Sequence, residues 1–215
     1  MFDYKRGVWQ LCKPKDLENK KPMEILQGAG VNVQLPIDLD TVLKSLKIIA
    51  APVDFSLLEK AKGEELVKLG RFMGIVGIRN ENVVMGYSKT LDFSHQRYAV
   101  AHELGHACIH TDVLRDGHVL ARYTGTLDSD KERVADKFAA ELLLPEEGFN
   151  DLFEECIVTF DLKEEGEKEL QQHRRRIVTY ISDKGVVPYF VAEDRLRELK
   201  PHIFACDCEG DAAID

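Results

Sequence analysis

Residues 97–110 read Arg97-Tyr-Ala-Val-Ala-His102-Glu-Leu-Gly-His106-Ala-Cys-Ile-His110, and they contain a His-Glu-x-x-His pattern. Residues four apart lie on one face of an α-helix, so the imidazoles of His102 and His106 can reach one metal ion. Glu103 is close enough to take a proton from metal-bound water without becoming a ligand. The stretch therefore predicts a helical metal site with Glu103 as the catalytic base.

The residues around the motif predict that this helix is buried. Ser94 is the expected N-cap, and the helix should run from there to about residue 110. Tyr98, Gly105 and Cys108 are spaced so that they share one face, which we expect to pack in the core. Because Gly105 has no side chain, a neighbouring element can approach the helix closely there.

The third metal ligand has to come from outside this helix. Catalytic zinc usually takes three protein ligands and keeps the fourth position for water. His110 continues the stripe but lies about 12 Å along the axis from His102, so the three histidines cannot share one ion. The metzincin pattern fails as well, because Asp112 stands where it needs a third histidine.

A second helix, expected from near Ser129 to Leu144, offers a carboxylate ligand. Glu132 and Asp136 are one turn apart on one face, so Glu132 could bind the metal while Asp136 accepts the other N–H of a ligating imidazole. Pro145 should close this helix. We expect its buried side to consist of four apolar residues: Val134, Ala135, Phe138 and Leu142.

Glu132 also has a competing interpretation. Ser129-Asp-Lys-Glu132 matches a capping box, in which the glutamate only satisfies a backbone N–H at the start of the helix. Spacing alone leaves the two interpretations open. Glu141, further along the same helix, is an additional candidate ligand.

The rest of the chain predicts short strands before the motif and helices after it. Strands are expected at 48–53, 74–79 and 83–87, with the polar turn 80–82 making a hairpin of the last two. Leucine and valine spacing predicts a helix over 39–46. No regular element is assigned within 1–34 beyond a loop or exposed helix end. After Pro145 we expect two or three helices, including 162–182 and 193–199 with a turn at Gly185, and a loosely held tail from Cys206.

Composition narrows the class of protein. The 215 residues are 44% hydrophobic and 31% charged, which is ordinary for a globular chain. No stretch approaches the ~20 consecutive apolar residues of a membrane span, and five scattered cysteines do not resemble a disulfide scaffold. The net charge of −9 argues against binding to a nucleic-acid backbone. We therefore expect a soluble cytoplasmic protein with no membrane partner and no direct nucleic-acid binding.

The motif helix, followed by Glu132-Arg-Val-Ala-Asp-Lys-Phe-Ala-Ala-Glu-Leu-Leu-Leu-Pro145, resembles the ImmA/IrrE metallopeptidases. The resemblance spans roughly residues 35–200. It implies an α+β fold, a minimal zincin in which the metal helix packs on a small twisted sheet and a helical C-terminal region follows. The chain would then divide into an N-terminal extension (1–34), a metallopeptidase core (35–145) and a helical region packed on that core (146–215).

The resemblance also implies a ligand set and a substrate. His102, His106 and Glu132 would bind zinc, with manganese as an alternative, and Glu103 would be the base. The substrate class would be helix-turn-helix repressors of the Xre type, whose cleavage switches on stress, phage or mobile-element genes. Asp136 departs from the asparagine common in the family at this position. No helix-turn-helix is recognised in 1–34, and the chain is too short for a C-terminal sensor domain.

Two roles remain open at the level of sequence. Tyr98 and His173 are candidates for stabilising the oxyanion opposite the metal, and His110 is a candidate hydrogen-bond partner behind the ligands. The basic run from His173 to Arg176 otherwise predicts a solvated helix face. The alternative function is a peptidase-like binding module that regulates a repressor or toxin without cleaving it, although the intact Glu103 favours an enzyme.

Overall fold

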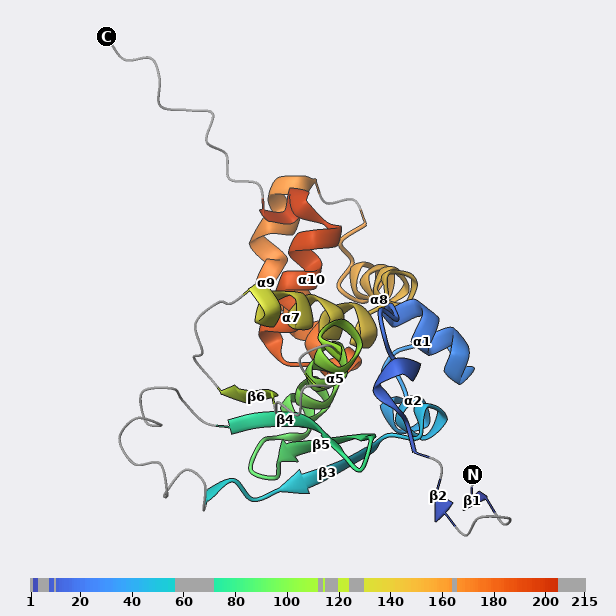
Figure 1. Ribbon diagram of the computed structural model, residues 1–215. Coiled ribbons are helices and arrows are strands. Elements are labelled where there is room, and N and C mark those ends of the chain that lie inside the picture. The colour runs from blue at the N-terminus through green and yellow to red at the C-terminus, as the bar shows by residue number, and fades with distance from the viewer. Residues whose placement is uncertain are drawn as a thin grey trace.

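A small mixed sheet forms one layer of the molecule. The computed structural model describes residues 2–3, 8–9, 11–56, 72–111, 114, 120–123, 130–163 and 166–204. The strands are β3 (Ile49–Val53), β4 (Phe72–Arg79), β5 (Asn82–Ser88) and β6 (Leu120–Tyr123), in the order β3-β5-β4-β6. β3 pairs with β5 in parallel, and the other pairs are antiparallel. The fold is α+β, as expected, because helices cover one side of this sheet (Figure 1).

The hairpin predicted at residues 80–82 is confirmed. β4 and β5 pair up to Arg79 and Asn82, and the two residues between them, Asn80 and Glu81, have φ angles of 50° and 63°. Two consecutive positive φ values are typical of the tight turn whose twist matches antiparallel strands. β6, which lies on the other side of β4, was not predicted.

The motif helix, α5 (Phe93–Ile109), packs on β4 and β5. Every side chain from Tyr98 to Cys108 is buried, so the helix is enclosed on all sides and not only on one face. The expected N-cap, Ser94, is wrong: the cap is Asp92, whose carboxylate accepts the backbone N–H of His95 at 3.1 Å. The Ser94 hydroxyl instead donates to that carboxylate at 2.7 Å.

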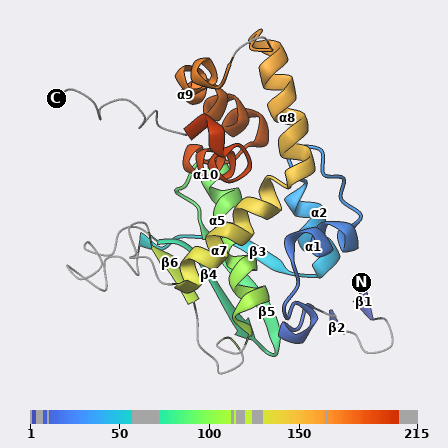
Figure 2. The ribbon, with the colours of Figure 1, turned by 90° about the horizontal axis from the view of Figure 1, so that it is seen from above.

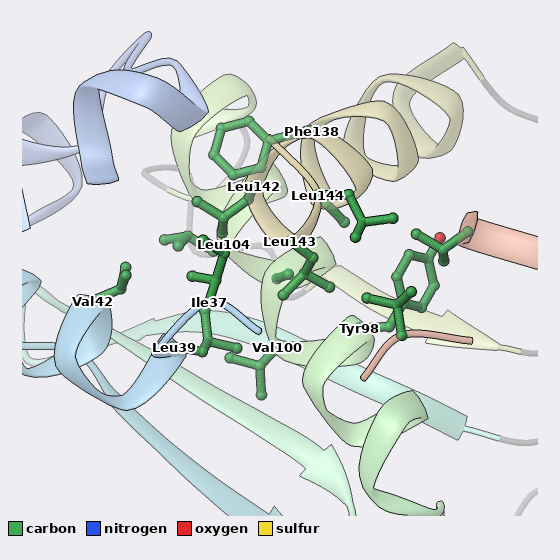
Figure 3. Packing of buried hydrophobic residues seen from close by; sticks show 14 of the residues in the cluster. Ile37, Leu39, Val42, Tyr98, Val100, Leu104, Phe138, Leu142, Leu143 and Leu144 are labelled. Carbon is green, nitrogen blue, oxygen red and sulfur yellow. The ribbon is translucent and has the colours of Figure 1, made fainter. Parts of the chain in front are cut away.

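The second predicted helix, α7 (Asp130–Leu143), lies on α5 on the side away from the sheet (Figures 1 and 2). A Cβ atom at Gly105 would be 3.1 Å from the ring of Phe138, so the absence of a side chain permits the contact predicted there. Val134 corrects the predicted buried side of α7, because its side chain is 43% exposed. In the core, Leu104 of α5 lies between Leu142 of α7 and the chain at Ile37 (Figure 3).

The N-terminal region is more regular than the sequence indicated. It contains a short pair of strands, β1 (Phe2–Asp3) and β2 (Val8–Trp9), then the 3-10 helix η1 (Pro14–Asp16), then α1 (Pro22–Ala29) and α2 (Leu39–Leu46). α2 was predicted, whereas α1 was not. α1 ends at Gly30, which takes a left-handed conformation with φ of 64°, and it packs on α2 and α7.

Three helices complete the described fold. α8 (Glu146–Thr159) follows Pro145 directly, α9 spans Glu167–Gly185, and α10 spans Tyr189–Leu199 before the 3-10 helix η2 (Pro201–Phe204). The predicted turn at Gly185 is wrong in detail, because Gly185 is the last residue of α9. α10 packs on both α9 and α7. The tail from Cys206 lies outside the described residues, and among those residues no helix has the length and apolarity to cross a bilayer.

Candidate metal centre

Three donor groups from α5 and α7 meet at one point. Nε2 of His102 lies 2.9 Å from Nε2 of His106. The two carboxylate oxygens of Glu132 lie 3.2 Å from the His102 nitrogen and 3.3 Å from the His106 nitrogen. The helical repeat places both imidazoles on the same side of α5, and α7 crosses there with its first turn. These three residues could hold one metal ion.

The chemistry and spacing of the three donors fit zinc. Two ligands at about 2.0–2.1 Å from a tetrahedral zinc ion are about 3.3 Å apart, close to the separations found between these atoms. Two imidazoles with one carboxylate are also a donor set of catalytic zinc sites. The histidines are 0% and 2% exposed, so the protein already excludes bulk water from the ligand nitrogens.

Asp136 contacts the His102 imidazole at the nitrogen that does not face Glu132. Its Oδ1 atom is 2.8 Å from Nδ1 of His102, on the opposite side of the ring from Glu132. A carboxylate there accepts the Nδ1–H, which leaves the Nε2 lone pair directed at the metal position. The same oxygen accepts a hydrogen bond from the Tyr98 hydroxyl at 2.6 Å.

The charges at the site suit ligation. Burial lowers the pKa of His106 and outweighs the opposing hydrogen bond with Glu132, so the ring stays neutral, as a ligand must. Burial raises the pKa of the Glu132 carboxyl, but hydrogen bonds with His102 and His106 dominate and hold it below its ordinary value. The lowered pKa keeps Glu132 an anion beside the two imidazoles, as a carboxylate ligand must be. Within the described residues, Nδ1 of His106 has no hydrogen-bond partner.

Glu103 is enclosed between α5 and the sheet. Its side chain is 1% exposed and lies against the backbone of β4, where a Cβ atom at position 74 would be 2.7 Å from its Oε1 atom. The carboxylate therefore has room only because residue 74 is a glycine. In the sequence Gly74 marks only the start of a predicted strand, and its contact with Glu103 depends on the packing of α5 on β4.

The remaining candidate residues are placed differently. The His110 ring lies 5.4 Å from the His106 ring between centroids, and its Nε2 atom is 3.4 Å from the carbonyl oxygen of Lys131. His173 is on α9, a helix that packs on α8, α10 and η2, whereas the donor group is built from α5 and α7. Glu141 is paired with Lys137 at 3.8 Å. Ser129, and with it the capping-box interpretation of Glu132, lies outside the described residues.

Comparison with known proteins identifies a peptidase family. The family model described as the IrrE N-terminal-like domain, peptidase family M78, matches residues 74–196, which is more than half of the chain. The match begins in β4, at the glycine beside Glu103, and runs through both metal-site helices to α10. No curated protein matches the chain.

Proposed function

Because the chain belongs to the M78 peptidase family, with its IrrE N-terminal-like domain, we propose that it is a zinc-dependent endopeptidase. The observation that carries the proposal is the convergence of the His102, His106 and Glu132 donor atoms within 4.8 Å of one another. His102, His106 and Glu132 would hold the metal, with manganese as an alternative ion, and Glu103 would be the catalytic base.

Each residue of the site would have a separate role in peptide-bond hydrolysis. Bound zinc would act as a Lewis acid and lower the pKa of its water to about 7. Glu103, next to His102 on α5, would accept a proton at its carboxylate and later deliver it to the leaving amine. Asp136 would hold the His102 ring in the ligating tautomer. Gly74 leaves the space in which the Glu103 carboxylate lies.

The substrate class follows from the family and from the sheet. A peptidase acts on a protein or peptide, and β6 is the edge strand next to β4, over which Glu103 lies. An extended peptide could add to such an edge through main-chain hydrogen bonds. Within this class we propose a helix-turn-helix repressor of the Xre type, cleaved at one site in a stress, phage or mobile-element switch. The proposed location is the cytoplasm.

Incubation with a candidate repressor tests the proposal. The purified protein, loaded with zinc or manganese, should convert the repressor into discrete fragments that mass spectrometry can assign to one peptide bond. Glu103→Gln should bind the same metal and release no fragment, because the amide cannot accept the proton. If wild type and Glu103→Gln regulate the target equally well without cleavage, the chain is a binding module and the enzymatic assignment is wrong.

A further inference from the structure

We infer that Tyr98 is a positioning residue of the metal centre, acting on His102 through Asp136. The inference rests on the proposed metal site and gives Tyr98 a role different from oxyanion stabilisation. The Tyr98 hydroxyl is already engaged with Asp136 at 2.6 Å, and that same Oδ1 atom is 2.8 Å from Nδ1 of His102. Oδ1 of Asp136 therefore contacts both the Tyr98 hydroxyl and Nδ1 of His102, the ring nitrogen that faces away from the proposed metal position.

The two partners of Asp136 are buried, whereas the Asp136 side chain is partly exposed to solvent. The His102 and Tyr98 side chains are almost completely buried in α5, and the Tyr98 ring has the ring of Phe190 against it, edge to face at 5.0 Å. The Asp136 side chain, in contrast, is 42% exposed. An exposed carboxylate on a helix surface can turn into water unless a second contact restrains it.

The surroundings of Asp136 also offer competing partners. A cavity of about 260 Å³ between α7 and α10 is lined by Asp136 together with Arg133 and Lys137. Arg133 already pairs with Asp130 at 2.7 Å and Lys137 with Glu198 at 3.1 Å. Both cations would still attract an Asp136 carboxylate that turned away from His102, since opposite charges attract near a protein surface. The Tyr98 hydroxyl holds Oδ1 on the other side, facing the imidazole. Without the Tyr98 hydrogen bond, Asp136 would hold the His102 ring less firmly in its ligating tautomer and orientation.

Zinc affinity tests this role directly. In competition with a chromophoric chelator, Tyr98→Phe should raise the zinc dissociation constant about tenfold, the low end of the range for losing a partner of a metal ligand. Tyr180→Phe is the matched control, because it removes another tyrosine-to-carboxylate hydrogen bond, to Glu155 at 2.7 Å, on α8 and α9. Tyr180→Phe should leave the zinc dissociation constant unchanged.

A double-mutant cycle separates positioning from a general loss of structure. Asp136→Ala alone should weaken zinc binding about 10- to 100-fold, and adding Tyr98→Phe should then change nothing further, because the proposed role of the Tyr98 hydroxyl is exerted through Asp136. Provided that wild type binds zinc, two results would overturn the inference. Tyr98→Phe could weaken zinc binding equally in both backgrounds, or it could leave zinc binding unchanged in both. If wild type bound no zinc, the proposed function itself would fail.

Discussion

At the scale of single residues, Glu132 decides whether the donor group is a metal site. Glu132→Ala leaves two imidazoles, so we expect the variant to lose most of the zinc that wild type retains after gel filtration, measured as metal per chain. Glu141→Ala removes a glutamate from the same helix, paired only loosely with Lys137 at 3.8 Å, and should keep its zinc. Full zinc retention by Glu132→Ala would favour the capping-box interpretation instead.

Gly74 gives a second prediction at this scale, and it needs no substrate. In Gly74→Ala the new methyl group would lie 2.7 Å from Oε1 and 2.9 Å from Cγ of Glu103, so an enclosed side chain must move. We expect a loss of about 1–3 kcal/mol in the free energy of unfolding, the usual cost of overpacking. Gly28→Ala is the control: it lies inside α1 with nothing within 4 Å of the added Cβ. Urea denaturation should show Gly28→Ala gaining about 0.5–1 kcal/mol.

At the scale of elements, the N-cap of α5 should contribute to the stability of the fold. Asp92→Ala removes the acceptor for the His95 backbone N–H and should cost about 1 kcal/mol of unfolding free energy. Ser94→Ala should cost less, because Asp92 and not Ser94 accepts the backbone N–H of His95. The free energy of unfolding is measured by urea denaturation at neutral pH. Equal losses in Asp92→Ala and Ser94→Ala would mean that Ser94 contributes to the N-cap as much as Asp92 does.

The same cap predicts a pH dependence. Hydrogen bonds from the Ser94 hydroxyl and then the His95 backbone N–H lower the pKa of Asp92 from 3.8 to about 2. A carboxyl whose pKa is lower in the folded state stabilises the fold above the unfolded value and loses that contribution as the pH falls towards the folded value. The advantage of wild type over Asp92→Ala should therefore shrink as the pH falls from about 4 to 2, where Asp92 is protonated. A difference that grows over that acidic range would contradict this assignment.

Helices and strands could be predicted from the sequence where turn residues, caps or prolines indicate their ends. The β4–β5 hairpin has a polar turn between apolar runs, and α2, α5 and α7 have helical spacing together with caps or a closing proline. α1 was missed because Gly28 sits inside it and Gly30 follows, so the sequence indicates a break while burial of Ile25 and Leu26 supplies the stability. The Tyr98–Asp136 hydrogen bond joins residues 38 apart in sequence, and only the packing of α7 on α5 brings them together.

At the scale of the whole molecule, the N-terminal residues belong to one continuous core. Leu17, Ile25 and Leu26 are at most 1% exposed and belong to the same cluster as Leu104 of the metal helix and Leu142 of α7. The backbone N–H of Asn19 also donates to the carbonyl oxygen of Cys108 at 2.9 Å. Residues of the predicted N-terminal extension thus contact α5, the helix that carries the candidate metal ligands His102 and His106.

That continuity predicts that α1 contributes to global stability. Leu26→Ala empties a fully buried position and should lower the free energy of unfolding by about 2–5 kcal/mol. Met23→Ala, in the same helix but 39% exposed, should cost less than about 1 kcal/mol. In urea denaturation followed by far-UV and near-UV circular dichroism, the Leu26→Ala transition should move as a single step by both probes, since one core unfolds together. A variant in which one probe shifts and the other does not would show that residues 11–31 form a separable unit, and the metal helix would then be stable without them.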